Sequence, residues 1–377
     1  MGSTFGDGES WVRGPLIGKG GFGSVFLATL KKPKPRFVCF PSTMAVKSAE
    51  VSVSGSLQKE KEVLDNVKGS PYVINCLGEE ITTPEKGEMV YNLLLEYASG
   101  GTLADSIEKS HGCRLPETDV KRYTWSILKG LGHIHDRGFV HCDLKPENVL
   151  LVPTIGPGGN FVAKIGDFGL AKRSAQKKKR RMDLDFYLRG TPLYMAPEAV
   201  IENVQKPPCD IWALGCLVCE MLTGKSPWDR EEELNAEELL QLIGDEREVP
   251  KIPNGVSDEA KSFLKSCLVR KPIYRFTAEM LMDHPFLTGI GYQLEDEYMK
   301  KEEHEVASPS VSCNETDSEF SGSSICSSFS VDDDDDSTLS KLSSWPEDGE
   351  NSEVQKSDKK PFAASLNTLP STILLRV

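Results

Sequence analysis

The stretch HCDLKPENVL, residues 141–150, decides the fold of this chain. It is a polar loop set between two short apolar runs that read as β-strands. On this loop Asp143 can accept a proton from a hydroxyl group, and Lys145 can neutralise charge on a group in transfer. Asn148 can hold a metal ion through its amide oxygen. A loop that offers a base, a cation and a neutral metal ligand suits phosphoryl transfer, where positioning and charge stabilisation do most of the catalysis.

The stretch IGDFGLA, residues 165–171, follows one hairpin later. It begins at the end of the strand-like run VAKI, and Asp167 is placed to bridge a magnesium ion to phosphate groups. A DFG tripeptide alone is common and carries little information. Its position after HCDLKPEN makes Asp167 a second candidate metal ligand.

A glycine-rich stretch, IGKGGFGSV at residues 17–25, lies near the N-terminus. Gly18, Gly20 and Gly23 have the spacing G-x-G-x-x-G, which lets a tight hairpin bring backbone N–H groups close to anionic phosphates. Dinucleotide-binding folds use the same spacing, but in those folds a helix follows the glycines. Here a strand-like run follows, which disfavours that alternative.

Lys47 and Glu60 form a candidate ion pair between a strand and a helix. A lone lysine on a strand is most often a solvated edge residue. Glu60, however, lies on the apolar face of the helix predicted for SLQKEKEVLDNVK, whereas Glu62 points to another face. A carboxylate on an apolar face is costly unless it finds a cation. Lys47 is its natural partner, and the pair would hold the ammonium within reach of the α- and β-phosphates of a nucleotide.

A fifth motif, GTPLYMAPE at residues 190–198, ends in Glu198, which we expect to be buried. Arg275 in RKPIYRFT is the candidate partner, and we expect this pair to be structural rather than catalytic. Cys216 and Cys219 form a CxxC inside the apolar run IWALGCLVCEML. A buried helix is favoured there over a metal site, because no second ligand pair follows at zinc spacing.

The composition divides the chain into regions. Residues 11–97 hold short strand-like runs, and residues 98–287 are mainly helical in pattern. Residues 1–10 form a short N-terminal segment, and residues 288–377 form an acidic, serine-rich tail that we expect to be mostly disordered. Residues 291–377 hold 19 of the 57 acidic and 7 of the 44 basic side chains, so the rest is almost neutral. That balance argues against nucleic acid as a partner.

Signals for membranes and secretion are missing from the sequence. No run of about 18 apolar residues is present, so we expect no membrane insertion. The start, MGSTFGDGES, lacks the parts of a signal peptide, and Gly6 stands where N-myristoylation needs serine or threonine. The ten cysteines are therefore expected to be reduced thiols. We expect a protein of the cytoplasm, with some of it in the nucleus.

The five motifs occur in one order at compatible spacings, and together they resemble the signature set of eukaryotic protein kinases over residues 11–287. The resemblance implies a two-lobed α+β fold. A small β-rich N-lobe with one regulatory helix would span residues 11–97, and a larger, mostly helical C-lobe residues 98–287. It also implies ATP as the phosphoryl donor and Mg²⁺ as a cofactor.

The resemblance implies roles for individual residues. The catalytic residues would be Asp143, Lys145, Lys47 and Glu60, and the metal ligands would be Asn148 and Asp167. The nucleotide-binding residues would be Ile17, Gly18, Lys19, Gly20, Gly21, Phe22, Gly23, Ser24, Val25, Ala45, Lys47, Leu95, Glu96 and Ala98. Among these, Leu95 aligns with the gatekeeper, and Glu96 and Ala98 with the hinge that receives adenine. Asp210 matches the aspartate that opens a buried central helix.

The kind of kinase is also indicated. Lys145 in DLKPEN and Thr191 in GTPLYMAPE match serine/threonine kinases. More narrowly, stretches such as MAVKSAE, LLLEYASGGTLAD and CDIWALGCLVCEMLTGKSPW are similar to plant MAP kinase kinase kinases. That similarity implies MAP kinase kinases as substrates, phosphorylated on their activation loops in stress or hormone signalling. The sequence does not indicate the upstream signal or the oligomeric state.

Two other functions compete with this interpretation. One is a serine/threonine kinase outside the MAP kinase cascade. The other is a pseudokinase that acts as a scaffold, which the presence of every catalytic motif disfavours. The tail is interpreted either as a regulatory or docking segment or as a solvated spacer.

One departure from the kinase pattern has consequences. Most members of the family have arginine before the catalytic aspartate, where this chain has Cys142. That arginine normally meets a phosphate on the activation loop. We therefore expect substantial activity without phosphorylation of that loop. The loop also holds the basic run 177–181, interpreted as a solvated tip or as a site for acidic partners or nuclear import.

Overall fold

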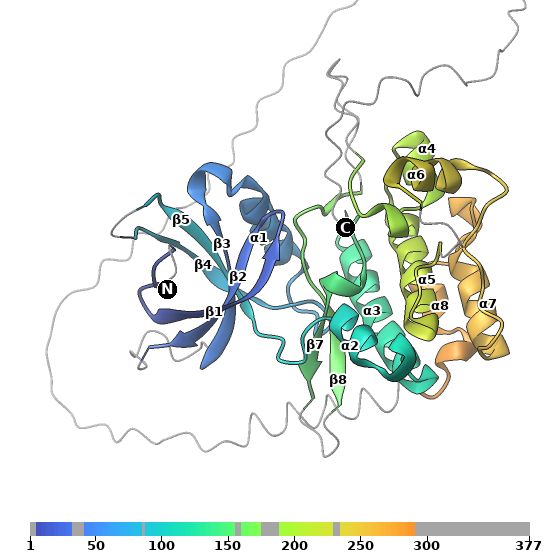
Figure 1. The fold of residues 1–377 in the computed structure, drawn as a ribbon, viewed down its shortest axis with the longest axis horizontal. Helices are drawn as coiled ribbons and strands as arrows, with labels where there is room; N and C mark the ends of the chain where they lie inside the picture. The colour runs from blue at the N-terminus through green and yellow to red at the C-terminus, as the bar shows by residue number, and fades with distance from the viewer. Residues whose placement is uncertain are drawn as a thin grey trace, which may run out of the picture. The chain divides into compact units, whose positions relative to one another are not determined.

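The structure is a computed structural model that describes residues 5–31, 41–84, 87–154, 160–174, 188–228 and 234–290 (Figure 1). Its strands are β1 (Trp11–Gly20), β2 (Gly23–Leu30), β3 (Thr43–Glu50), β4 (Cys76–Thr82), β5 (Val90–Glu96), β6 (Phe139–Val140), β7 (Val149–Pro153), β8 (Phe161–Ile165) and β9 (Lys172–Arg173). Its α-helices are α1 (Gly55–Val67), α2 (Leu103–Lys109), α3 (Glu117–Asp136), α4 (Pro197–Glu202), α5 (Pro207–Thr223), α6 (Ala236–Gly244), α7 (Asp258–Cys267) and α8 (Ala278–Met282). The basic run 177–181 and the tail from residue 291 lie outside the described residues.

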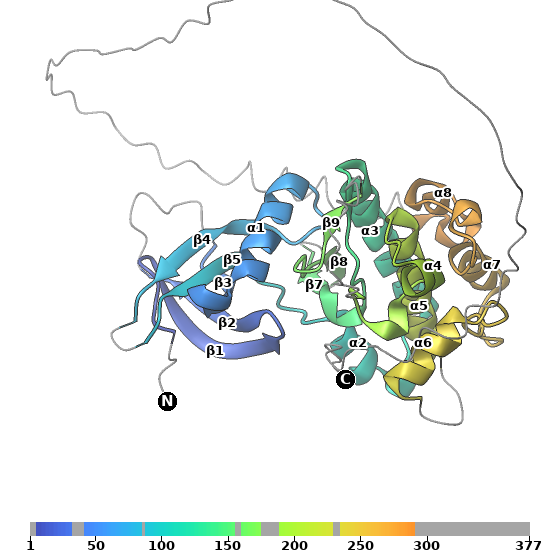
Figure 2. The ribbon, with the colours of Figure 1, turned by 90° about the horizontal axis from the view of Figure 1, so that it is seen from above.

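The N-lobe is an antiparallel sheet with the strand order β1-β2-β3-β5-β4. Helix α1 packs against β3, β4 and β5, as Figure 2 shows. Its buried residues fall three and four positions apart and include Glu60, as the predicted apolar face required. The register places Lys47 of β3 opposite Val25 of β2 and Leu93 of β5. Lys47 is thereby fixed at the centre of the sheet.

A second, smaller core covers the other face of this sheet. It consists of Trp11, Ala28, Met44, Val46 and Leu94. Because successive side chains of a strand point to opposite faces, β3 contributes to both cores at once. The lobe is therefore stabilised on both sides of the strand that carries Lys47.

Arg13 ties residues 5–10 to this outer face. Its guanidinium donates hydrogen bonds to the carbonyl of Gly6 at 2.7 Å, to Ser48 at 2.8 Å and to Asn92 at 2.8 Å. It also lies 4.7 Å from the ring centre of Phe26. Burial lowers the pKa of Arg13 to about 10. This pKa is still well above 7, so the guanidinium is charged at neutral pH. The residue pattern did not predict this contact.

The C-lobe is built around α3 and α5. Helix α3 packs against β8, α5 and α8. Helix α5 is buried almost all round, and both Cys216 and Cys219 are buried in it. The buried helix predicted for the CxxC is therefore present. Across the described parts of the chain, no group of three or more His, Cys, Asp or Glu side chains could hold a metal ion. Among the same residues, no helix is long and apolar enough to cross a membrane.

Several elements differ from expectation. Strand β4 was not predicted, because two glutamates interrupt its apolar pattern and it lies at the edge of the sheet. The pattern of VKRYTWSILKGLGHIH predicts a helix that starts after Asp119, but α3 begins two residues earlier, at Glu117. The sequence also predicts that helices resume near Pro207, but the short α4 precedes it and ends at Asn203 in a left-handed conformation.

Candidate active site

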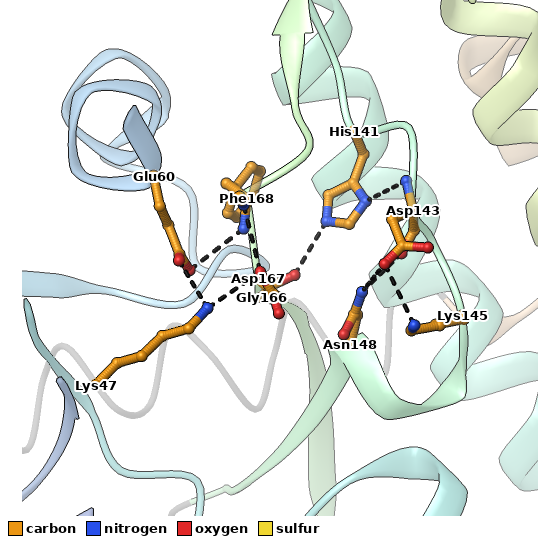
Figure 3. A network of polar contacts seen from close by, with 10 residues as sticks. Lys47, Glu60, His141, Asp143, Lys145, Asn148, Gly166, Asp167 and Phe168 are labelled. Carbon is orange, nitrogen blue, oxygen red and sulfur yellow. Dashed lines mark hydrogen bonds and ion pairs between the residues drawn. The ribbon is translucent and has the colours of Figure 1, made fainter. Parts of the chain in front are cut away.

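A buried ion pair joins β3 to α1 (Figure 3). The ammonium nitrogen of Lys47 lies 2.7 Å from a carboxylate oxygen of Glu60 and 3.1 Å from one of Asp167. The side chains of Lys47 and Glu60 are 7% and 1% exposed, so their charges are held almost out of water. The contact predicted between Lys47 and Glu60 is therefore present, and Asp167 shares the same ammonium.

The charges of this cluster stabilise one another. Burial alone lowers the pKa of Lys47, but the carboxylates of Glu60 and Asp167 raise it above its ordinary value. Burial alone raises the pKa of Asp167, but Lys47 and the N–H of Gly169 lower it below its ordinary value. At neutral pH the lysine is therefore protonated and Asp167 is ionised.

The DFG stretch is held by both lobes. The second carboxylate oxygen of Glu60 accepts a hydrogen bond from the backbone N–H of Phe168 at 3.3 Å. The Phe168 ring is fully buried and lies edge-on to His141, with ring centres 5.0 Å apart. His141 in turn contacts the carbonyl of Gly166 through Nε2 at 3.0 Å. Asp167 has φ +54, and these contacts on both sides hold it in that left-handed conformation.

Three polar side chains gather around Asp143 of the catalytic loop. Thr191 donates a hydrogen bond to one carboxylate oxygen of Asp143 at 2.7 Å. Lys145 lies 3.3 Å from the other oxygen and donates to the Thr191 hydroxyl at 2.8 Å. Asn148 donates to the Asp143 carbonyl at 2.7 Å and to its carboxylate at 3.1 Å. Sequence reasoning placed Thr191 in a family motif but did not predict its contact with Asp143.

Asp210, at the start of α5, holds the catalytic loop in place. Its two carboxylate oxygens accept hydrogen bonds from the backbone N–H groups of His141 at 2.9 Å and Cys142 at 3.0 Å. His135 lies 2.9 Å from the same carboxylate. Cys142 has φ +70, so the loop turns sharply just before Asp143. The anchor that the resemblance implied for Asp210 is thus made through backbone N–H groups.

The glycine-rich hairpin turns between β1 and β2. A Cβ on Gly23 would lie 2.6 Å from the carbonyl oxygen of Ser48, so the fold itself requires glycine at that position. At Gly18 and Gly20 the nearest atoms would lie 3.7 and 3.9 Å away, which are ordinary contact distances. The folded chain therefore does not require glycine at these two positions. Close approach of the backbone to a phosphate group would account for glycine there.

The residues expected around adenine lie on β3, β5 and the segment after it. Ala45 and Leu95 face each other in register and are both buried. The carboxylate of Glu96 accepts two hydrogen bonds of 2.8 Å from Lys164 of β8 and one of 3.2 Å from the N–H of Asn75. Lys164 was not predicted, because a lysine in a strand carries no signal of its partner in sequence.

The oxygen atoms expected to hold magnesium are available. Asn148 uses its amide hydrogens on Asp143, which leaves its amide oxygen for a cation. The side chain of Asp167 is 36% exposed, although its neighbour Lys47 is buried. Magnesium prefers oxygen ligands and is often bound through one or two side chains together with substrate phosphates. The residues present therefore fit Mg²⁺ bound together with a nucleotide.

These features define a phosphotransferase of the protein kinase class. They are a β-rich lobe with a lysine–glutamate pair, a glycine hairpin, two oxygen ligands for a metal ion, and a carboxylate beside a lysine. The chain belongs to the protein kinase family: the family model of the protein kinase domain matches residues 11–287.

Curated relatives place the chain more narrowly. It is 45% identical over 289 residues to mitogen-activated protein kinase kinase kinase 20 of Arabidopsis thaliana, covering 76% of this chain and 80% of that protein. It is 41% identical over 284 residues to mitogen-activated protein kinase kinase kinase 17 of the same plant, covering 74% of this chain and 69% of that protein. It is 40% identical over 287 residues to mitogen-activated protein kinase kinase kinase 18 of the same plant, covering 74% of this chain and 78% of that protein. The chain is a serine/threonine protein kinase of the MAP kinase kinase kinase group.

Proposed function

We propose that this kinase phosphorylates serine or threonine hydroxyls in the activation loops of MAP kinase kinases, with ATP and Mg²⁺. The single observation that supports catalysis most directly is the meeting of Lys47, Glu60 and Asp167 within hydrogen-bond distance. The substrate class is supported by the names of the relatives, which include several MAP kinase kinase kinases.

The residues of the site divide the work. ATP with Mg²⁺ supplies the transferable phosphoryl group when it is bound. Lys47, held by Glu60, presents a fixed positive charge to phosphate oxygens. Asp143 orients the substrate hydroxyl and takes its proton, while Lys145 offsets the developing negative charge. Thr191 holds both of these side chains in place by hydrogen bonding to each.

The decisive experiment uses a purified MAP kinase kinase whose own ATP-binding lysine has been replaced, so that it cannot label itself. After incubation with this kinase, ATP and Mg²⁺, phosphosites are mapped by mass spectrometry. We expect phosphate on the activation-loop hydroxyls and none when these are changed to alanine. Phosphate found only outside that loop would favour a kinase outside the MAP kinase cascade.

A pseudokinase scaffold predicts a different result. Radioactive phosphate transfer is compared between the wild type and Asp143→Asn, which keeps the shape of the side chain but removes its charge. We expect loss of transfer in the variant. Equal signals from the two proteins would support the scaffold function instead.

We also propose that the kinase acts in stress or hormone signalling and is located in the cytoplasm, with some of it in the nucleus. The basic run 177–181 supports the nuclear part of this proposal. A fluorescent fusion of the full chain tests it. Neutral replacement of that run should reduce the nuclear signal, and unchanged distribution would contradict the proposal.

A further inference from the structure

The stretch of sequence before Thr191 has few residues that could be phosphorylated. Between residues 175 and 190 the sequence has no serine or threonine, and Tyr187 is the one hydroxyl side chain there. The arginine that would bind a phosphate is replaced by Cys142, whose side chain is short and neutral. The thiol stays neutral because burial and the nearby Asp210 carboxylate raise the pKa of Cys142 to about 12. Residues 189–191 therefore depend on contacts other than a phosphate to stay against the catalytic loop.

Three cations lie near Cys142, and one of them is Arg189. Lys59 of α1, Lys172 of β9 and Arg189 all act on Cys142 electrostatically. Burial, followed by the charges of Arg189 and Lys172, lowers the pKa of Lys59, although Glu62 opposes this in part. Among the described residues none of the three cations has a carboxylate within ion-pair distance. The charges of Arg189 and Lys172 repel that of Lys59, and no ion pair with a described residue holds Arg189 in place.

Gln205 makes the hydrogen bond that holds Arg189 in place. Its side-chain amide donates a hydrogen bond of 2.7 Å to the backbone carbonyl of Arg189, and its side chain is buried. The neighbouring residue Val204 is itself fixed by two hydrogen bonds. The N–H of Val204 donates to the carbonyl of Glu198 at 3.1 Å, and the thiol of Cys209 donates to the carbonyl of Val204 at 3.4 Å. The donor is therefore presented from a rigid position.

Arg189 is two residues from the active site. Gly190, with φ +114, lies directly on the catalytic loop, since a Cβ there would be 2.5 Å from the carbonyl oxygen of Cys142. Thr191 then reaches Asp143. A small cavity lies at this junction, lined among others by Cys142, Thr191, Gln205 and Cys209. A displacement of Arg189 would therefore move Thr191 and the base that it orients.

We infer that Gln205 is a positioning residue that locks residues 189–191 onto the catalytic loop, so that catalysis does not require a phosphate on the activation segment. The inference rests on the proposed kinase activity and concerns how the same site is regulated. Because Thr191 contacts Asp143 and Lys145, the lock acts on the substrate hydroxyl rather than on the nucleotide. Loss of the lock should therefore change kcat/KM for the protein substrate and leave KM for ATP almost unchanged.

The test compares variants of the full chain after phosphatase treatment. Gln205→Met keeps the length of the side chain but removes the donor, and Gln205→His restores an N–H at similar reach. Ser257→Ala is the matched control, because it removes a 2.7 Å hydrogen bond to Glu117 far along the chain from the lock. Rates are measured on an inactivated MAP kinase kinase and on myelin basic protein, with KM determined for protein and for ATP.

We expect the dephosphorylated wild type to stay active. Gln205→Met should lower kcat/KM for both protein substrates by about three- to tenfold, the range of one hydrogen bond, with KM for ATP unchanged. Gln205→His should recover most of the loss, and Ser257→Ala should lower thermal stability without changing kcat/KM. If the methionine variant does not fold, Gln205→Glu, which also lacks the donor, replaces it.

Three results would overturn the inference. The first is a wild type that falls to the level of Asp143→Asn on phosphatase treatment. The second is a Gln205→Met variant with unchanged kcat/KM, and the third is a histidine variant no better than the methionine one. A wild type inactive on both substrates before phosphatase treatment would refute the proposed function and the inference together. A wild type active on myelin basic protein alone would leave the lock testable and reject the proposed substrate.

Discussion

At the scale of single residues, the Glu60 carboxylate makes one contact more than the ion pair with Lys47 that the sequence predicts. One oxygen binds the Lys47 ammonium, and the other accepts the backbone N–H of Phe168. The side chain is almost completely buried, so each contact replaces water that Glu60 has lost. Removal of one partner therefore leaves an uncompensated charge inside the protein.

Lys47→Met should abolish phosphoryl transfer and also destabilise the fold. Breaking a buried ion pair by removing one partner costs about 3–5 kcal/mol, because the remaining carboxylate stays buried without a cation. Adding Glu60→Gln should recover part of the free energy of unfolding but none of the activity. Urea denaturation and a radioactive transfer assay measure the two properties separately.

Glu62→Gln is the matched control for this pair, since Glu62 is exposed on another face of α1. It should change neither property. Full activity of Lys47→Met, or a double variant less stable than either single variant, would contradict the assigned role of the pair.

At the scale of elements, the start of α5 holds the catalytic loop through Asp210. Burial alone raises the pKa of Asp210, but His135 and the N–H of His141 lower it below the usual carboxyl value. A carboxyl whose pKa is lower in the folded than in the unfolded state contributes stability above the unfolded value of about 3.9. That stability is lost as the pH falls from there through the folded pKa.

Asp210→Asn should therefore cost the most stability at neutral pH. The difference in free energy of unfolding between wild type and variant should be constant above about pH 5 and shrink below about pH 4. Thermal unfolding followed across this range by circular dichroism measures the difference. A difference that stays constant down to the acid limit would show that the charge of Asp210 does not matter.

A second link between elements joins α4 to the segment before α8. Arg275 lies 2.7 Å from one carboxylate oxygen of Glu198 and 3.0 Å from the other, as the predicted structural pair requires. Arg275→Met should lower the free energy of unfolding by about 3–5 kcal/mol, because Glu198 would stay buried without its cation.

Urea denaturation of the purified full chain measures this change. Lys261→Met, which removes an exposed partner of Asp258, should cost less than about 1 kcal/mol. Equal losses in the two variants would contradict the difference expected between buried and exposed ion pairs.

Elements with a strong apolar period were predictable, and contacts made through the backbone were not. The helix predicted for SLQKEKEVLDNVK follows directly from its pattern, and the structure has it as α1. By contrast, the Asp210 bonds and the Gln205 bond end on main-chain atoms, which every residue type possesses. Sequence cannot identify such a partner, because the main chain has no residue-specific signal.

At the scale of the whole molecule, the folded unit extends beyond the residues that the family model matches. That match begins at residue 11, yet residues 5–10 contribute to the outer face of the sheet. The indole N–H of Trp11 and the N–H of Glu9 both donate to the carboxylate of Glu80, at 2.8 and 2.7 Å. Residues 5–10 are therefore part of the structure of the N-lobe.

A chain that starts at residue 11 should be less stable than the full chain by about 1.5–3 kcal/mol, the range for a hydrogen bond to a charged group. It would lose the Gly6 carbonyl and the Phe5 ring, and Arg13 would stay buried with fewer partners. Differential scanning calorimetry measures the change. Arg13→Met in the full chain should reproduce most of it, and an unchanged melting temperature in both would contradict the assigned contacts.

Cys142 also has a consequence for the design of inhibitors. A thiol beside a catalytic aspartate suggests a target for covalent drugs that other kinases would escape. With a pKa of about 12, however, only about one thiol in 10⁵ is ionised at pH 7, and electrophiles react with the thiolate. A warhead aimed at Cys142 must therefore gain its selectivity from long residence in the pocket, because the intrinsic reactivity of this sulfur is low.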